Sequence, residues 1–348
     1  MKFIELTDND FQQFAENHPQ ANFNQTIAMK KVRQSLGFQI CLLGIKQSDK
    51  IIAAGLVTII NSRVKSAGIY YGPLLDYSNL EVLQFWTGNL KNYLAKEGVV
   101  YCSINPNLIY AIHNSDGQID ESFKSTKAEF DNLVKLGYKH NGWTKTGVDA
   151  ANRWHYVKNL APFFDNYDNL IMSFRSTTRQ RIRKYHKNNL QVRQLSLDEV
   201  DIFLNLLTMS ASKHGFQPRD KAYFSALIKY FSEARLLNLL GAFTTNDTPV
   251  STALFIIYAK SCIYFHSGNN SEYLKLLGSY ALQDYMFKYC LDERIPKYNF
   301  LGFEAVFDKP NGVLDFKKGF KGYIEELVGS FELPINNFKY KLYRWLKK

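Results

Sequence analysis

The chain has 348 residues and carries 43 Lys and Arg against 32 Asp and Glu, a formal charge of +11. Hydrophobic residues make up 46% and charged residues 22%, a composition that excludes an intrinsically disordered chain. The longest apolar run, residues 51–60, is shorter than the roughly 20 residues that cross a bilayer, and the start MKFIELTDNDFQQF is too polar for a secretory leader. We therefore expect a cytoplasmic protein, and the length favours two domains.

The four cysteines and seven histidines give no sign of a metal site. Cys41, Cys102, Cys262 and Cys290 lie far apart in apolar segments, without the paired spacing of a zinc site. We expect buried, reduced thiols, no metal and no cofactor.

In chain order, two stretches follow the same plan. FQICLLGIKQSDKIIAAGLVTIINSRVKSAGIYYGP begins at residue 38, and LLNLLGAFTTNDTPVSTALFIIYAKSCIYFHSGN begins at residue 236. Each reads as an antiparallel meander of three strands separated by polar turns. The helical patterns around the copies cover residues 10–17, 25–36 and 80–96 for the first and 197–213, 219–232 and 274–290 for the second. A strand at 297–302 completes the second copy, so the order predicts a duplication.

This order resembles the N-acetyltransferase (GNAT) fold. The resemblance implies an α/β (α+β) protein of two tandem GNAT-like domains, each with a central, mainly antiparallel sheet flanked by helices. Acetyltransferases of this fold bind the CoA pyrophosphate at a glycine-rich helix start. The first copy lacks that turn and the second keeps only Gly278 and Ala281, which disfavours CoA without excluding it.

Two segments carry many cations and no acid. The first, STTRQRIRKYHK at 176–187, predicts a helix capped by Ser176 or Thr177. The second is the C-terminal INNFKYKLYRWLKK, which interleaves aromatic residues with its lysines. Such clusters suit RNA or an anionic membrane face, although an ordinary solvated helix face is the alternative.

Taken together, a series of separated motifs resembles the Fem family of non-ribosomal peptidyl transferases. The motifs are NFNQTIAMKKV, IYYGPLLD, INPNL, NRWHYVKNL, STTRQRIRKYHKNNLQV, SASKHGFQPRDKAYF, IYFHSGN, KYNFLG and GVLDFKKGFKG. The resemblance implies a first domain over 1–157 that binds the precursor and a second over 158–330 that carries the catalytic lysine. Residues 331–348 would form a basic helix that packs back on the first domain.

The resemblance also implies an activity and its partners. Fem enzymes transfer Ala, Ser or Gly from aminoacyl-tRNA to the stem-peptide lysine of a peptidoglycan precursor, UDP-MurNAc-pentapeptide or lipid II. Members acting on lipid-linked precursor often carry a helical hairpin, for which the segment from Tyr223 to Leu237 leaves no room. The aromatic, cationic C-terminus would nevertheless suit a peripheral contact at the inner membrane leaflet, so the choice of acceptor stays open.

Residues matching the family's precursor contacts can be named here. They are Lys31 with Lys30 beside it, Tyr71, Arg219 and Tyr223. Arginine offers a fork to phosphate oxygens, and lysine a mobile point charge. Without the family, Lys31 reads as an exposed helix lysine and Arg219 as half of an ion pair with Asp220.

The pair Phe316-Lys317 matches the family's catalytic segment. We expect the Lys317 ammonium to stabilise the oxyanion that forms when the acceptor amine attacks the tRNA ester. Gly319 and Gly322 would let the backbone approach the ligand closely. The residues expected to contact tRNA are Arg179, Arg181, Arg183, Lys184, Lys318 and Lys321.

Three positions depart from the family pattern. Asn105 stands where an acidic residue is expected, Val100 replaces a tyrosine, and His266 replaces another. We count Asn105 and His266 among the candidate catalytic residues, although a lone histidine on a strand is more often structural. The alternatives to a Fem transferase are a CoA- or carrier-dependent acyltransferase and an altered protein that only binds RNA or a membrane surface.

Overall fold

The computed structural model describes residues 1–214 and 217–346. The chain forms two compact units. Unit 1 comprises 1–112, 119–153 and 325–348, and unit 2 comprises 113–118 and 154–324.

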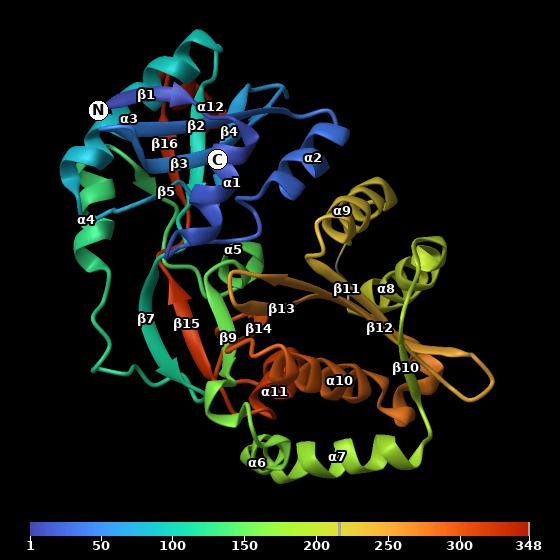
Figure 1. The fold of residues 1–348 in the computed structure, drawn as a ribbon. Coiled ribbons are helices and arrows are strands. Elements are labelled where there is room, and N and C mark those ends of the chain that lie inside the picture. The colour runs from blue at the N-terminus through green and yellow to red at the C-terminus, as the bar shows by residue number, and fades with distance from the viewer. Residues whose placement is uncertain (215–216, 347–348) are drawn as a thin grey trace. The chain divides into compact units, whose positions relative to one another are not determined.

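Unit 1 is built on a mixed sheet with strand order β1-β2-β3-β4-β6-β16-β8, and β5 pairs with β3 (Figure 1). Its strands are β1 (Lys2–Glu5), β2 (Gln39–Gln47), β3 (Lys50–Ile60), β4 (Ser66–Tyr70), β5 (Leu74–Leu75), β6 (Tyr101–Asn105), β8 (Lys139–His140) and β16 (Phe331–Pro334). Its helices are α1 (Asp8–Asn17), α2 (Ile27–Ser35), α3 (Leu80–Lys96), α4 (Lys127–Lys135), α5 (Gly147–Ala151) and α12 (Asn337–Leu346).

The core of unit 1 centres on the long helix α3. Trp86 of this helix is fully buried and its ring packs edge-on against Phe3, with 5.7 Å between the centroids. Gly55 on β3 is small for this reason, since a Cβ there would lie 3.0 Å from the Trp86 ring. Burying a tryptophan removes a large apolar area from water, which holds α3 on the sheet.

Unit 2 is built on a second sheet of order β10-β11-β12-β13-β14-β9-β15-β7, in which β7 and β15 also carry residues of unit 1. The strands are β7 (Ile109–Asn114), β9 (Trp154–Asn159), β10 (Gln191–Gln194), β11 (Leu237–Phe243), β12 (Pro249–Tyr258), β13 (Ser261–Asn269), β14 (Lys297–Gly302) and β15 (Tyr323–Leu327). The α-helices are α6 (Tyr167–Ser173), α7 (Ser176–Lys187), α8 (Val200–His214), α9 (Lys221–Glu233), α10 (Gly278–Asp292) and α11 (Gly312–Lys318), and 3-10 turns cover Ala161–Phe163, Leu197–Glu199 and Ser271–Leu276.

The duplicated order predicted from the sequence is confirmed. In unit 1 the meander β2-β3-β4 is antiparallel, and β4 then pairs parallel with β6 after the crossover helix α3. In unit 2 the meander β11-β12-β13 is antiparallel, and β13 pairs parallel with β14 after α10. The predicted α/β class with mainly antiparallel sheets flanked by helices is confirmed as well.

The two parallel pairs differ in length. The β4–β6 pairing runs to the last residues of both strands, Tyr70 opposite Asn105. The β13–β14 pairing stops at Ile263 opposite Asn299, so the last residues of β14 have separated from β13. This early separation matters because the carboxyl end of β14 contributes to the site in unit 2.

Several element boundaries differ from the prediction. The helix expected over 274–290 is interrupted at Leu277, whose left-handed backbone (φ +65°) separates a 3-10 turn from α10. The basic helix α7 is capped by Arg175, without a side-chain hydrogen bond, so the predicted Ser176 or Thr177 cap is wrong. Both residues already lie inside the first helical turn, where their hydroxyls cannot serve as the cap.

The cysteines agree with the expectation. All four are free thiols; Cys102, Cys262 and Cys290 are buried and Cys41 is half-buried. Burial raises the pKa of the Cys102 thiol to about 12, so this group is an unreactive thiol at neutral pH.

Candidate functional site

Lys317 lies inside unit 2 near the end of helix α11. Asn311 caps this helix by accepting a hydrogen bond from Leu314 N at 3.1 Å, and Lys317 falls in its last turn. The lysine is 5% exposed, and its Nζ donates to Leu301 O at 2.9 Å and to Gly302 O at 2.6 Å. These carbonyls belong to the end of β14, where the strand has left β13.

Burial changes the proton affinity of this lysine. Desolvation lowers the pKa of Lys317 to about 7, because a buried ammonium is costly. An ammonium has three N–H donors and two of them are used by the carbonyls. The third has no partner among the described residues, so the group can hold or release a proton near neutral pH and still donate to a ligand.

Phe316, the other half of the predicted catalytic pair, belongs to an aromatic cluster. Its ring lies 5.3 Å from the ring of Tyr280 and 5.2 Å from that of Phe320, both in edge contact. These contacts fix the last turn of α11 against α10 and thereby position the neighbouring lysine. Phe316 itself carries no group for acid–base chemistry.

A second buried lysine in unit 2 was not predicted from the sequence. Nζ of Lys158, on β9, donates to Ser173 Oγ at 2.8 Å and to Lys321 O at 2.9 Å. Burial, and then the charge of Lys321, lower the pKa of Lys158 to about 8. The only signal was its place in NRWHYVKNL, and the contacts show that it holds the backbone just after α11.

His155 on the same strand is fully buried, and sequence reasoning missed it too. Its ring nitrogen Nδ1 lies 3.4 Å from Asn299 Nδ2 on β14. Burial, followed by the charges of Lys297 and Lys317, lowers the pKa of His155 to about 3. It is therefore neutral at pH 7 and contributes a hydrogen-bonding group without charge beside Lys317.

The predicted role of the two glycines after Lys317 is wrong. A Cβ on Gly319 would lie 2.3 Å from Thr178 Oγ1 of α7, and one on Gly322 would lie 1.9 Å from Val157 O of β9. The space that we assigned to a ligand is filled by the protein itself. These glycines allow close packing of the segment after α11 on α7 and β9.

Arg219, Tyr223 and His266 come together in unit 2. The Arg219 guanidinium lies 5.3 Å from the Tyr223 ring centroid, at the start of α9. Phe224 contacts both the Tyr223 ring at 5.4 Å and the His266 ring at 5.1 Å. Burial and the Arg219 charge lower the pKa of His266 to about 4, so at neutral pH this histidine is uncharged.

Arg219 has no ion-pair partner within residues 1–214 and 217–346, so its charge is available there. Asp220 does not form the alternative ion pair, because its carboxylate caps α9 by accepting from Tyr223 N at 2.8 Å. Arg219 lines an open hollow of about 590 Å³ together with residues of α8. Residues 215–216, in the same motif SASKHGFQPRDKAYF, lie outside the described residues.

In unit 1 the two adjacent lysines of α2 differ. Lys30 Nζ pairs with Asp8 Oδ1 at 2.5 Å and is only 19% exposed. Lys31 is exposed and has no hydrogen-bond or ion-pair partner among the residues that the structure describes. Of the two, Lys31 is the one with a charge available to a phosphate.

Asn105 and Tyr71 also come together in unit 1. Tyr71 has a left-handed backbone (φ +52°), and its N–H donates to Asn105 Oδ1 at 3.1 Å. Asn105 is the last residue of β6, and this hydrogen bond fixes the turn that follows β4. Val100, the other departure in this region, is buried and its N–H bonds to Lys65 O.

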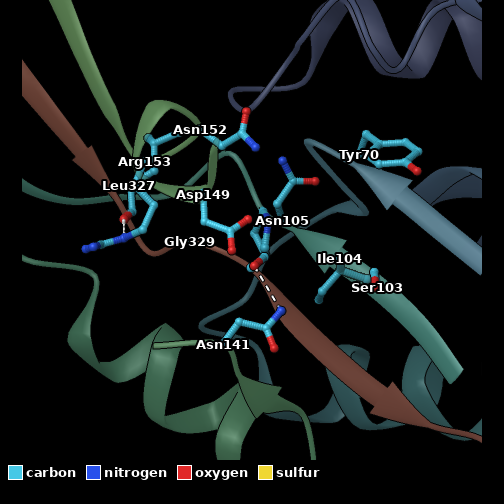
Figure 2. A pocket seen from close by; sticks show the side chains of 12 residues that line it. Tyr70, Ser103, Ile104, Asn105, Asn141, Asp149, Asn152, Arg153, Leu327 and Gly329 are labelled. Atoms are coloured by element: carbon cyan, nitrogen blue, oxygen red, sulfur yellow. Dashed lines mark hydrogen bonds between the residues drawn. The ribbon is translucent and has the colours of Figure 1, made fainter. Parts of the chain in front are cut away.

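The turn and Asn105 border a hollow of about 210 Å³ in unit 1 (Figure 2). Its lining is about equally polar and apolar, and the polar residues come from the end of β6, from α5 and the residues just after it, and from the segment joining β15 to β16. One carboxylate, Asp149, lines it. No sequence motif had singled out this residue.

The residues expected to contact tRNA fall into two groups. Arg183 and Lys184 on α7 are exposed, as is Lys321 after α11. The others are partly engaged within unit 2: Arg179 with Met172 O and Phe174 O, Arg181 with Tyr280 Oη at 2.5 Å, and Lys318 with Asp116 at 3.0 Å. Helix α7 lies alongside α10 (Figure 1), and Ile182 and Tyr185 are among its buried residues.

The geometry can now be compared with known proteins. A sequence profile of the FemAB family matches residues 6–241 and 237–348, which is nearly the whole chain. The chain belongs to the FemAB family.

Relatives in this family are similar over their full length. Aminoacyltransferase FemA of Staphylococcus aureus strain bovine RF122 / ET3-1 is 28% identical over 419 residues, covering 100% of this chain and 99% of the relative. FemA of strain MRSA252 is also 28% identical with the same coverage. Because the alignment is longer than this chain, FemA carries insertions that are missing here, in line with the short form expected from the sequence.

Solved structures support the fold. The crystal structure of FemX superposes with a TM-score of 0.85 at 18% identity, covering 98% of this chain and 99% of that chain. A tandem GNAT protein from the clavulanic acid biosynthesis pathway superposes with a TM-score of 0.56 at 10% identity, covering 96% and 98%. The predicted tandem GNAT-like architecture of this FemAB-family chain is confirmed.

The helix starts that would hold a CoA pyrophosphate have other uses in this FemAB-family chain. Helix α3 is capped by Asn79, which accepts from Val82 N at 3.2 Å. A Cβ on Gly278, at the start of α10, would lie 2.5 Å from Ser251 Oγ, so this glycine allows tight packing on β12. Neither start shows the open glycine-rich loop that phosphate binding needs.

The described residues hold no group of three or more His, Cys, Asp and Glu side chains placed to bind a metal ion. Within the same ranges, none of the helices combines the length and the apolar character needed to span a bilayer.

Proposed function

We propose that this FemAB-family chain is a transferase that moves Ala, Ser or Gly from aminoacyl-tRNA to the stem-peptide lysine amine of a peptidoglycan precursor. The observation that carries the proposal is the state of Lys317, buried at the end of β14 with one N–H left for a ligand. Family membership and the FemA relatives named aminoacyltransferases support the reaction class.

The chemistry needs one hydrogen-bond donor of the right charge. The acceptor amine attacks the ester carbonyl carbon, the C–N bond forms, and the carbonyl oxygen becomes an oxyanion. Collapse of this intermediate breaks the ester C–O bond, and the ribose hydroxyl of the tRNA leaves with a proton. Lys317 donates its third N–H to the oxyanion, and its low proton affinity, with a pKa of about 7, lets it pass that proton to the leaving oxygen. The neutral lysine then takes up the excess proton of the attacking nitrogen, which leaves a neutral amide and restores the ammonium.

The precursor contacts are part of the same proposal. Lys31 and Arg219 bind the precursor phosphates, since both charges are available in their own units. The Tyr223 ring stacks on the Arg219 guanidinium and orients it. Tyr71 lies in a turn that its hydrogen bond to Asn105 holds in place. His266, uncharged at neutral pH, offers a hydrogen bond beside Tyr223.

The tRNA partner would lie on the exposed cations of unit 2. Arg183, Lys184 and Lys321 are the exposed members of the predicted set whose side chains make no bond to another described residue. They contact phosphates and therefore position the donor without selecting its sequence. Arg179, Arg181 and Lys318 support the same surface through their intramolecular bonds.

The direct test is transfer of radiolabelled Ala, Ser or Gly from charged tRNA, with UDP-MurNAc-pentapeptide and lipid II as parallel acceptors. We expect product with at least one pairing and a strongly reduced rate with Lys317→Met. A folded wild-type protein that gives no product with any pairing overturns the proposal. That outcome would favour an RNA- or surface-binding protein that has lost turnover.

The CoA-dependent alternative is tested separately. Neither helix start offers an open phosphate loop, so we expect no heat of binding on titration with acetyl-CoA. Saturable CoA binding would favour the alternative acyltransferase.

We also propose a peripheral membrane contact through helix α12, which favours lipid II as acceptor. Phe338, Leu342 and Trp345 recur at helical spacing and are 79%, 49% and 71% exposed. The opposite face is anchored, because Tyr340 Oη donates to Glu332 at 2.7 Å and Tyr343 stacks on Tyr101 at 5.0 Å. Lys347 and Lys348 at its end lie outside the described residues.

An apolar face beside cations is typical of helices that lie in an anionic membrane interface. Lys339, Lys341 and Arg344 supply the cations of α12. We expect co-flotation with phosphatidylglycerol vesicles but not with phosphatidylcholine vesicles, and loss of flotation in Trp345→Ser. Ile119→Ser, which removes an exposed apolar side chain elsewhere in unit 1, is the control. Equal flotation of both variants would contradict the contact.

A further inference from the structure

The hollow of Figure 2 has an unbalanced negative charge. Its volume of about 210 Å³ exceeds the roughly 150 Å³ that holds a benzene molecule, so one amino-acid side chain fits. Asp149 is exposed to it from α5, and this carboxylate has no ion pair or hydrogen bond among the described residues.

The nearest candidate counter-ion, Arg153, is already committed elsewhere. Its guanidinium forms an ion pair with Glu326, and donates to Thr144 O at 2.7 Å and to Leu327 O at 3.3 Å. It also stacks on Trp143, with 4.9 Å to the ring centroid. In Figure 2 the Asp149 carboxylate lies beside Asn105, whereas the Arg153 guanidinium points away toward Leu327. Since Arg153 pairs with Glu326, it does not serve as the counter-ion of Asp149.

The rest of the lining adds neutral polar groups. Asn141 Nδ2 donates to Ser330 Oγ at 3.0 Å, which orients its amide oxygen as an acceptor. Asn105 and Asn152 add two further amides. Tyr70 and Ile104 supply an apolar part of the wall. One carboxylate, several neutral acceptors and a short apolar wall match a primary ammonium on an aliphatic chain.

We propose that this hollow binds the aliphatic ammonium side chain of the acceptor, with Asp149 as its counter-ion. The inference rests on the proposed function for the identity of the acceptor, whereas the ammonium chemistry follows from the hollow alone. Asp149 thus selects an acceptor that carries a free amine, and Asn105 shapes the hollow by holding the Tyr71 turn.

The test measures binding without tRNA, so it does not depend on turnover. The probes are UDP-MurNAc-pentapeptide with lysine in the stem and the same precursor with norleucine, which lacks the amine but keeps the methylenes. We expect Asp149→Asn to weaken binding of the lysine precursor about tenfold, equal to about 1.4 kcal/mol, and to leave the norleucine precursor unchanged. Asp49→Asn makes the same charge change at a distant turn of unit 1 and should alter neither affinity.

A second pair of probes separates this inference from the proposed function. Nα-acetyl-lysine methylamide and Nα-acetyl-norleucine methylamide carry only the side chain, and saturation-transfer NMR detects weak binding of either. If neither precursor binds but the lysine probe binds in an Asp149-dependent way, the hollow is an ammonium site and the proposed acceptor is wrong. If transfer occurs but Asp149→Asn changes neither the lysine preference nor any affinity, the inference is overturned and the proposed function stands. Matching circular dichroism and melting curves show that the variant is folded.

Discussion

The two units share one order of elements but place their polar groups differently. In unit 1 the strand after the crossover helix, β6, ends in Asn105, whose side chain holds the Tyr71 turn beside an open hollow. In unit 2 the equivalent strand, β14, ends in the backbone carbonyls that hold buried Lys317. The same position in the repeat therefore carries a polar site in both units, open and acidic in one, closed and cationic in the other.

The pairing of the parallel strands accounts for part of this difference. Because β14 leaves β13 after Asn299, the carbonyls of Leu301 and Gly302 are not paired with β13 and accept from Lys317 instead. In unit 1 the ladder continues to Asn105, so only its side chain is available for the turn. Duplicated scaffolds can thus diverge in chemistry by changing where a ladder ends.

The largest expected effect comes from Lys317→Met, which removes the buried cation of the site in unit 2. We expect turnover to fall by about 10²–10³-fold, as when one oxyanion donor is removed, with the precursor KM unchanged. Initial rates of amino-acid transfer measure this, and Lys309→Met, an exposed lysine nearby, is the control. Unchanged turnover would remove Lys317 from the catalytic role.

The pH dependence of the unfolding free energy tests whether Lys317 is buried, in contrast to the open acidic hollow of unit 1. The pKa of Lys317 is about 7 in the folded chain and about 10.4 in an unfolded one. Between these values the unfolded chain binds the extra proton, so this group makes folding more stable as pH rises. The difference in unfolding free energy between wild type and Lys317→Met should change by about 1.4 kcal/mol per pH unit from 7.5 to 10, measured by urea titration. A constant difference would mean that the lysine is not buried in solution.

Glycine substitutions compare the packing of the two units. Gly322→Ala would place a methyl group against Val157 O, so we expect a loss of roughly 1–3 kcal/mol or more in unfolding free energy. Gly88→Ala in the middle of α3 meets nothing within 4 Å and should stabilise by about 0.8–1 kcal/mol through helix propensity. Thermal or urea unfolding tests both. A neutral Gly322→Ala would restore the possibility that this glycine serves a ligand.

The smallest effect separates two neighbouring lysines of unit 1. Lys31→Ala should raise the KM for UDP-MurNAc-pentapeptide about tenfold, and Arg219→Ala in unit 2 should do the same. Lys30→Ala should change it little, because Lys30 pairs with Asp8. Steady-state kinetics with varied precursor concentration measures these KM values. A larger rise in KM for Lys30→Ala than for Lys31→Ala would assign the phosphate contact to Lys30.

Sequence reasoning succeeded where the signal was local. Alternating and helical apolar patterns gave the two meanders and the crossover helices nearly to the residue, as for α3 at Leu80–Lys96. It failed at the α7 cap and at Leu277. Helix propensities differ by only about a few tenths of a kcal/mol per residue, too little to decide against tertiary packing. It also misread Gly322, because the atom that excludes a side chain there, Val157 O, is far away in sequence.

The sequence by itself determined the duplication, the fold class and the family, since these depend on the order of patterns and motifs along the chain. Only the tertiary structure decided which charges are available. Lys30 pairs with Asp8, whereas Lys31 has no partner in the part of the chain that the structure describes. Lys317 is buried against carbonyls of β14, and Arg153 is neutralised by a glutamate 173 residues away. These outcomes depend on contacts between distant segments, and the free energy of a charge is set by the dielectric and partners that those contacts create.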